Sequence, residues 1–233
     1  MRRSLRKLRT YVGRLIRDIG RKATVPDAAL TTLLERADRV RRQQPHDTHK
    51  LYSLHEPEVQ CISKGKAHKR YEFGQKVAIA TTNRGNWMVA ARLLPDNPYD
   101  GHTLAETLTA IQAVTGVSVT DAYVDKGYRG HGCTQTVNVH VAGQRGDGTR
   151  TERRRRRRRS AVEPKIGHLK SDHRMDRCFL AGLTGDAINA VLAAAGSNLR
   201  KLLRRLAAAL TWWLQLATET PFPSARLCLR GQS

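Results

Sequence analysis

The sequence predicts an α/β protein that is flanked by basic helical segments. Two strand-like runs, one amphipathic helix and two more strand-like runs follow each other between residues 76 and 141. This alternation is typical of folds in which helices cover a sheet, so we expect one mixed sheet. The flanking segments have apolar residues at helical spacing and many arginines, which indicates helices with a charged face.

Residues 1 to about 45 predict two basic helices. Apolar residues recur at helical spacing from Leu5 to Ile19, and the first 22 residues hold nine Lys and Arg against one Asp. After a break at 25–27 the same apolar pattern returns. One interpretation is that the charged face of these helices is simply exposed to solvent and has no function in binding. The one-sided charge favours a surface that contacts a DNA backbone, with the candidates Arg6, Lys7 and Arg14.

The central elements follow from changes in hydrophobic period. Residues 76–82 and 87–94 are strand-like, and the turn-forming residues 83–86 join them as a hairpin. Thr103 and Glu106 predict a capping box that starts an amphipathic helix, which ends at Gly116. Residues 117–125 and 137–141 are the last two predicted strands.

The carboxy-terminal part is predicted to be helical. Seven consecutive arginines, 153–159, follow a glycine-containing loop; they are either a solvated tether, disordered without a partner, or a phosphate-binding strip. We expect Asp186 to cap a long helix that begins after Gly185. Trp212 and Trp213 at its end are expected in a core or an interface, and the tail from Glu219 is expected to be poorly ordered.

Charge limits the kinds of partner. The chain has 42 Lys and Arg against 20 Asp and Glu, a formal net charge of +22, which calls for an anionic partner. Nucleic acid is the obvious polyanion, and a membrane surface is the other candidate. A ribosomal or chromatin-like structural protein, binding RNA or DNA without catalysis, would have the same composition. Charge alone therefore does not indicate an enzyme.

The cysteines and the apolar segments predict a cytoplasmic protein. Four widely spaced cysteines form no CxxC pair, which fits a reducing compartment; a zinc site starting from His131 and Cys133 has no second pair to complete it. No apolar run follows the first arginines as in a signal peptide, and the stretch 206–217 is too short to cross a bilayer. We expect no membrane association.

Two carboxylates are candidates for chemistry. Asp125 ends an apolar strand, where functional groups of α/β sheets gather, although a turn-starting Asp before Gly is common and structural. Glu163 is either the third residue of a capping box that starts at Ser160, or points inward from a helix with Arg159 and Lys170 on the same face. Paired carboxylates in a basic chain suit two-metal phosphoryl transfer, with arginines on the flanking phosphates.

Several segments resemble transposases of bacterial insertion sequences. The transposases that these segments resemble are DDE-class enzymes with an IS4-type transposase domain, in the insertion-sequence family numbered five. The resemblance covers roughly residues 5–206. Its clearest words are LYSLHEPEVQCISKGKAH (51–68), YEFGQKVAIATTN (71–83), LPDNPYDGHTL (94–104), AYVDKGYRGH (122–131), RRRSAVEPKIGHLK (157–170) and GDAINAVLAAAGSNLRKLL (185–203).

The resemblance implies a ribonuclease-H-like fold in which two Asp and one Glu hold two Mg²⁺ or Mn²⁺ ions. Asp125 matches the second Asp and Glu163 matches the Glu of a Tyr-x2-Arg-x3-Glu-x6-Lys signature. Arg159 and Lys170 match its Arg and Lys, whereas its Tyr is Arg156 here. No counterpart of the first Asp is found, so we expect a truncated or split product whose first strand is missing from the sheet, with weakened metal binding.

These observations predict a domain organisation and a function. We expect a basic helical segment (1–50), the carboxy-terminal part of the catalytic domain (51–216) and a tail (217–233). The predicted function is metal-dependent DNA cleavage at element ends and strand transfer, impaired in this copy; the alternative is a non-catalytic DNA-binding remnant that occupies transposon ends or modulates an intact transposase. Expected partners are double-stranded DNA with terminal inverted repeats, target DNA, and a second copy or an intact transposase, in the nucleoid. The expected DNA contacts include Arg153, Arg154, Arg155, Arg156, Arg157 and Arg158.

Overall fold

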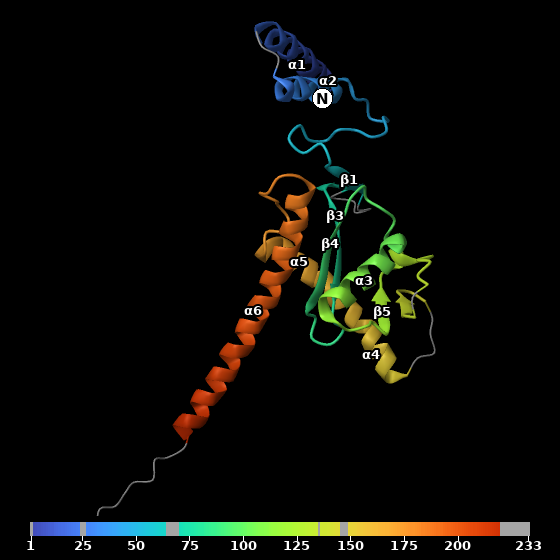
Figure 1. Ribbon diagram of the computed structural model, residues 1–233, viewed down its shortest axis with the longest axis vertical. Helices are drawn as coiled ribbons and strands as arrows, with labels where there is room; N and C mark the ends of the chain where they lie inside the picture. Colours follow the sequence, from blue (N-terminus) through green and yellow to red (C-terminus); the bar gives the residue numbers. More distant parts are fainter. Residues whose placement is uncertain (1, 24–26, 64–69, 135, 145–148, 220–233) are drawn as a thin grey trace, which may run out of the picture.

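The computed structural model describes residues 2–23, 27–63, 70–134, 136–144 and 149–219. The two predicted basic helices are confirmed as α1 (Arg2–Lys22) and α2 (Ala28–Arg42). They pack against each other at one end of the molecule (Figure 1). The Asp27 carboxylate caps α2 by accepting a hydrogen bond from the amide of Ala29 at 3.1 Å. The predicted break falls at this cap and at residues 24–26, which lie outside the described part.

A first hairpin was not predicted from the sequence. Strands β1 (Gln60–Ser63) and β2 (Tyr71–Gly74) pair antiparallel, with Cys61 opposite Phe73. Each strand has four residues, too few for an alternating apolar pattern to stand out. Their sheet contains no further strand among the described residues.

The second hairpin confirms the prediction. Strands β3 (Lys76–Thr81) and β4 (Met88–Leu94) pair antiparallel in the register Val77 opposite Leu93, with an irregularity between Ala80 and Thr81. The turn that joins them contains two residues with positive φ, Gly85 at 94° and Asn86 at 53°. Glycine and asparagine adopt this backbone conformation most readily, which explains why the chain reverses here.

The predicted amphipathic helix is confirmed as α3 (Leu104–Thr115), which ends at Gly116 in the left-handed conformation. Its predicted capping box is wrong. A short 3-10 helix (Asp100–Thr103) precedes α3, so Thr103 already has helical backbone angles and makes no side-chain cap. Its buried hydroxyl instead donates to the carbonyl of Asp100 at 2.8 Å.

The last two strands pair parallel with each other. They are β5 (Asp121–Val124) and β6 (Asn138–Val141), both shorter than predicted, with Ala122 opposite Val139. The prediction of one mixed sheet does not hold among the described residues, because β5–β6 and β3–β4 are separate two-stranded sheets. The architecture is mixed α/β with small sheets and helices, as expected at the level of fold class.

The arginine run is helical. Helix α4 (Arg150–Arg158), a 3-10 turn (Arg159–Ala161) and helix α5 (Val162–Asp172) follow without a break. Of the two interpretations of Glu163, the capping box at Ser160 is excluded, because the Ser160 hydroxyl donates to the carbonyl of Arg157. The capping box lies eleven residues earlier instead: Thr149 and Glu152 bond each other's backbone amides at 3.3 and 2.9 Å.

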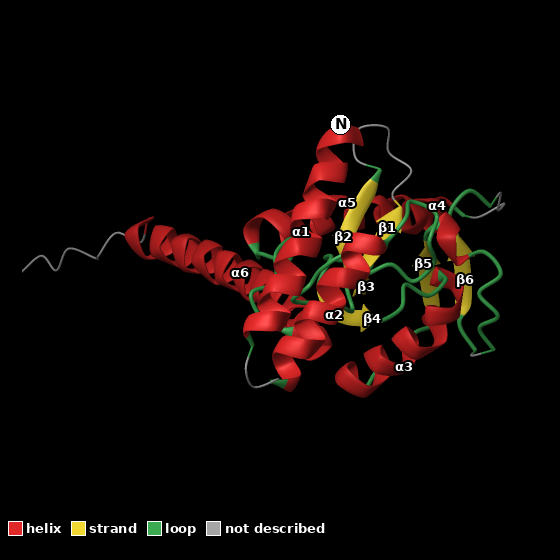
Figure 2. Cartoon of the chain, turned by 90° about the horizontal axis from the view of Figure 1, so that it is seen from above, coloured by secondary structure: helices red, strands yellow, loops and turns green. Residues whose placement is uncertain are grey.

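The long helix α6 (Gly182–Glu219) starts before the predicted position, and Asp186 lies inside it, so the predicted Asp186 cap is wrong. Its first half packs on β4 and α5 through a core of Met88, Leu169, Ala193 and Ala194. Figure 1 shows the β3–β4 hairpin between α6 and α3, and Figures 1 and 2 show the second half of α6 extending away from the rest. No helix in the described part of the chain is long and apolar enough to cross a membrane.

Candidate functional site

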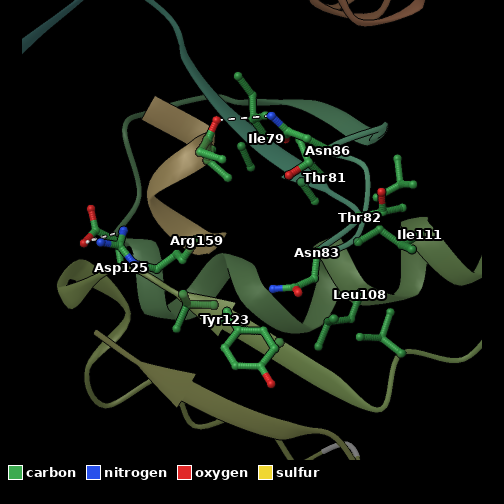
Figure 3. Close-up of a pocket in the computed structure, with 18 of the residues that line it drawn as sticks. Ile79, Thr81, Thr82, Asn83, Asn86, Leu108, Ile111, Tyr123, Asp125 and Arg159 are labelled. Carbon is green, nitrogen blue, oxygen red and sulfur yellow. Dashed lines mark hydrogen bonds and ion pairs between the residues drawn. The ribbon is translucent and has the colours of Figure 1, made fainter. Parts of the chain in front are cut away.

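A cavity of about 850 Å³ lies between the β3–β4 hairpin, α3, β5 and the start of α5 (Figure 3). Its apolar wall includes Ile79, Leu108 and Ile111, which Figure 3 shows together with Tyr123. Its polar wall holds four carboxylates and several cations. Those charged residues are Asp100, Asp121, Asp125, Glu163, Lys76, Arg84, Arg158 and Arg159.

Two strand edges form opposite sides of this cavity. All residues of β3 (76–81) and of β5 (121–124) line it, rather than every second residue as on the face of a sheet. Among the described residues, β3 pairs only with β4, and β5 pairs only with β6. The cavity is therefore a gap between the unpaired edge of one small sheet and the unpaired edge of another.

Asp125 lies directly after β5, as the sequence predicts. Its carboxylate accepts a hydrogen bond from the amide of Lys126 at 2.8 Å and so starts a short 3-10 turn, which is the structural role that the sequence left open. The same oxygen lies 3.4 Å from the Arg159 guanidinium (Figure 3). The Asp125 side chain is 66% exposed, so it is also accessible to a ligand.

Glu163 reaches the same cavity from the start of α5. Val162, Glu163 and Ile166 all line the cavity, as do the two preceding arginines, Arg158 and Arg159. Glu163 is exposed, and it lies in the first turn of α5, whose start has no side-chain cap. The structure thus brings Asp125, Glu163 and Arg159 to one cavity although 38 residues separate the two carboxylates in the sequence.

Lys170 lies elsewhere. Its ammonium group is 3.1 Å from the Glu72 carboxylate on β2, and the residue does not line the cavity. Of the four residues that resemblance assigns to the site, three meet at the cavity and Lys170 ties α5 to the first hairpin.

Two further carboxylates at the cavity were missed by the sequence analysis. Asp100 pairs with Lys76 at 2.6 Å and packs so closely on Gly127 that a Cβ at residue 127 would overlap its carboxylate. The Asp121 carboxylate accepts a hydrogen bond from the His140 Nε2 at 2.9 Å and lies 4.0 Å from the Arg155 guanidinium. No local motif marks either residue, because Asp100 lies in a short 3-10 helix and Asp121 at the first position of β5, and only tertiary packing brings the two to one cavity.

Hydrogen bonding and burial shift the pKa values of two groups that line the cavity, Asp121 and Tyr128. The hydrogen bond with His140 lowers the pKa of Asp121; burial opposes this effect, and the charges of His140 and Arg155 add to it. Burial raises the pKa of the Tyr128 hydroxyl, which lines the cavity, although a hydrogen bond with Thr103 works against that rise. Asp121 therefore stays ionised and Tyr128 stays neutral near neutral pH.

The arginines of α4 form a continuous basic helix beside the cavity. Four of the six predicted DNA contacts on it, Arg153, Arg154, Arg155 and Arg157, are exposed, whereas Arg156 and Arg158 are half-buried. The Nε atom of Arg156 is buried and has no hydrogen-bond partner among the described residues. The other predicted contacts, Arg6, Lys7 and Arg14, are exposed on α1, at the opposite end of the molecule from α4 (Figure 1).

The donors at the cavity fit Mg²⁺ in kind but not in number. Carboxylate oxygens are the ligands that Mg²⁺ prefers, and Asp125 and Glu163 supply them at the same cavity. However, no group of three or more His, Cys, Asp or Glu side chains in the described residues is close enough to hold an ion. His131 and Cys133, the start of the zinc site considered in the sequence, contact each other locally: the ring Nδ1 of His131 accepts a hydrogen bond from the backbone amide of Cys133.

Four aspartates of the amino-terminal part lie outside the cavity. Asp18 and Asp38 pair with arginines or lysines of their own helices, Asp27 caps α2, and Asp47 accepts from the amide of Gln44. Among the residues that the structure describes, Asp100 and Asp121 are the carboxylates that join Asp125 and Glu163 at the cavity wall.

Residues 125–203 match a protein family described as the transposase DDE domain. The matched segment begins at Asp125 and contains Arg159, Glu163 and Lys170. No curated protein and no solved structure matches the chain.

Proposed function

We propose that this chain, whose residues 125–203 carry the signature of a DDE transposase, binds double-stranded DNA across the cavity and presents a phosphate to Asp125 and Glu163. The parent activity would be cleavage at the ends of an insertion sequence and strand transfer, in the IS4-type group of family five. The observation that carries the proposal is the meeting of Asp125, Glu163 and Arg159 at one cavity beside a helix of arginines.

The arrangement of charge supports DNA binding. Helix α4, whose last residue Arg158 lines the cavity, offers exposed guanidinium groups, which can form paired hydrogen bonds with phosphate oxygens. Arg159 directly follows this helix and contacts Asp125, so a phosphate held at the end of α4 would lie near the carboxylate. Contacts of this kind position the duplex without reading its sequence.

We propose Asp125 and Glu163 as two ligands of a divalent ion, Mg²⁺ or Mn²⁺. The bound ion would polarise a phosphate and activate an attacking oxygen. The protein residues have their own tasks: Arg159 keeps the Asp125 carboxylate oriented and Arg158 adds positive charge at the cavity wall. Lys170 is proposed to act indirectly, by fixing α5 to β2.

The third ligand is proposed to come from an additional strand, so this chain alone would be catalytically impaired. The unpaired edges of β3 and β5 face each other across the cavity, and an extended segment between them would join the two sheets into one mixed sheet. Such a strand would bring its own side chains beside Asp125. An intact transposase subunit could supply it, as a partner of this chain.

Self-association through α6 is a further part of the proposal. Leu192, Leu199, Leu206 and Trp213 repeat at intervals of seven residues and are each between 57% and 60% exposed. A seven-residue apolar repeat is the seam of a coiled coil, in which identical helices cover each other's stripe. Trp212 and Trp213 were expected to lie in a core or in an interface. Both are exposed, so they do not belong to the core of this chain, and an interface is the remaining alternative. The proposed location of the assembly is the bacterial nucleoid.

The test is cleavage of DNA that carries the ends of the element encoding this chain, with Mg²⁺ added. The chain alone is expected to bind these ends and to cut weakly, and addition of an intact transposase is expected to restore cutting. Asp125→Asn should bind equally well and reduce the restored cutting in mixed assemblies. Equal cutting by the wild type and Asp125→Asn would remove the catalytic assignment.

A second candidate function is a non-catalytic DNA-binding protein that occupies transposon ends. The observation that favours it is the absence of a three-ligand group among the described side chains. It predicts that added chain inhibits cleavage by an intact transposase in proportion to end occupancy, and that Asp125→Asn and Glu163→Gln inhibit as well as the wild type.

A further inference from the structure

The turn between β3 and β4 is held between two basic elements. On one side, the Asn83 amide donates to the carbonyl of Arg155 at 2.9 Å. The Asn86 amide donates to the carbonyl of Ala161 at 3.2 Å (Figure 3). On the other side, the ammonium group of Lys201 on α6 donates to the carbonyl of Gly85. The turn therefore connects the arginine helix to α6.

Two cations of α6 lie on the indole ring of Trp87, which follows this turn. The Lys201 ammonium and the Arg205 guanidinium are each 4.9 Å from the ring centroid. They are four residues apart on α6 and so share one face of the helix. Cation–π contact holds both charges in place while leaving them free to bind an anion.

A third cation joins them from α5. The pKa of Lys165 is lowered by burial and further by the charge of Lys201, and the pKa of Lys201 is lowered by burial and by Arg205. The charge of Lys201 thus reaches Lys165, and the charge of Arg205 reaches Lys201, so the three cations form a chain of repelling neighbours. None of the ion pairs found in the described residues includes Lys165, Lys201 or Arg205. We call Trp87 and these three residues the Trp87 cluster.

Like charges that repel each other without a carboxylate partner destabilise a fold until an anion binds between them. We propose that the Trp87 cluster binds the phosphate backbone of double-stranded DNA and extends the DNA-binding surface from α4, across the β3–β4 turn, to α6. This inference rests on the proposed function. The hydrogen bonds of Asn83, Asn86 and Lys201 make the surface continuous, and continuity with the arginine helix favours DNA over a separate anionic partner.

The test measures binding of the full chain to a short fluorescently labelled duplex of mixed sequence over a series of salt concentrations. Arg205→Gln and Lys165→Gln should each weaken binding about threefold to tenfold and reduce the slope of log affinity against log salt by about 0.9. The matched control is Arg204→Gln, which removes the same charge from the next residue of α6, about 100° around the helix. It should change affinity less than about twofold and leave the slope unchanged.

Two further variants separate DNA contact from a structural role of the cluster. Arg205→Lys keeps the charge and should keep the slope, whereas a loss equal to that of Arg205→Gln would overturn the proposal. Urea unfolding of each variant should show that the fold is retained in the binding assays. Equal losses for Arg204→Gln and Arg205→Gln would also overturn it, because they would indicate diffuse attraction by net charge.

The outcomes distinguish this inference from the proposed function. If the wild type binds the duplex and the cluster variants behave like Arg204→Gln, only the Trp87 cluster is wrong. If the wild type does not bind DNA, both proposals fail. Tighter binding to an RNA duplex of the same sequence would overturn the assignment to DNA.

Discussion

The guanidinium of Arg159 lies 3.4 Å from the carboxylate of Asp125, and this pair connects the end of β5 to the end of the arginine helix. The two residues come from elements that are adjacent only through folding. The contact makes Asp125 part of a charged surface and not merely the first residue of a turn.

Arg159→Gln should weaken DNA binding without unfolding the protein. Because Asp125 is 66% exposed, its ion pair contributes little to stability, and the free energy of unfolding should change by less than about 1 kcal/mol. Loss of this positive charge next to the proposed phosphate position should lower affinity by roughly threefold to tenfold. Fluorescence anisotropy and urea unfolding measure the two effects. Arg21→Gln, which removes an exposed arginine paired with Asp18 on α1, is the control, and an equal loss of affinity there would contradict a specific role for Arg159.

Gly127→Ala should destabilise the loop that follows Asp125. A Cβ at residue 127 would overlap the Asp100 carboxylate, which in turn pairs with Lys76. We expect a loss of about 1–3 kcal/mol in the free energy of unfolding. Gly167→Ala is the matched control: no atom lies near its added Cβ, and it should stabilise α5 by about 0.5–1 kcal/mol. Similar effects of both substitutions would contradict the close packing of Asp100 on Gly127.

The Asp121–His140 pair predicts how stability depends on pH. The His140 hydrogen bond lowers the pKa of Asp121 in the folded protein, so the folded state favours the ionised carboxylate. This contribution is present above the unfolded pKa of about 3.9 and is lost as the pH falls through the lower folded pKa. Urea unfolding at a series of acidic pH values should therefore show a shallower loss of stability for Asp121→Asn than for the wild type. Asp96→Asn, in an exposed turn, should follow the wild type; parallel curves for all three proteins would show that Asp121 makes no such contribution.

Backbone amides of β3 should exchange with solvent in an alternating pattern. Every second residue of an antiparallel edge strand directs its amide to the partner, and the residues between direct theirs away. In β3 the first set faces β4 and the second faces the cavity. Hydrogen exchange followed by NMR should show slow and fast amides in turn. Uniformly slow exchange along 76–81 would mean that another segment already pairs with this edge.

The sequence predicted the elements that local patterns determine. The α1–α2 pair, the β3–β4 hairpin, α3 and the β5–β6 strands follow from apolar period and turn residues. Helix starts were predicted less well. Thr103, Ser160 and Asp186 have the residue type of caps, but the chain before each is already helical, so no amide is left for them to cap. The motif at Thr149 and Glu152 is a real capping box and was overlooked.

The candidate site could be predicted only in part, because much of it depends on tertiary packing. Resemblance placed Asp125, Glu163 and Arg159 together, and the three residues do meet at one cavity. Lys170 was assigned to the site but pairs with Glu72 on a strand that the sequence did not predict. Asp100 and Asp121 reach the cavity because the 3-10 helix and β5 that carry them pack there, with contacts to Lys76 and His140, and this packing leaves no pattern in the sequence.

The central claim is that Asp125 and Glu163 share a divalent ion on DNA. Fe²⁺ in place of Mg²⁺, with ascorbate and peroxide, generates short-lived radicals that cut the polypeptide close to the ion. In the DNA-bound full chain we predict cuts near both residues, displaced by excess Mg²⁺ and lost together in Asp125→Asn, which should still bind DNA. Cuts at only one of the two positions, or cuts that persist in Asp125→Asn, would contradict a shared metal site.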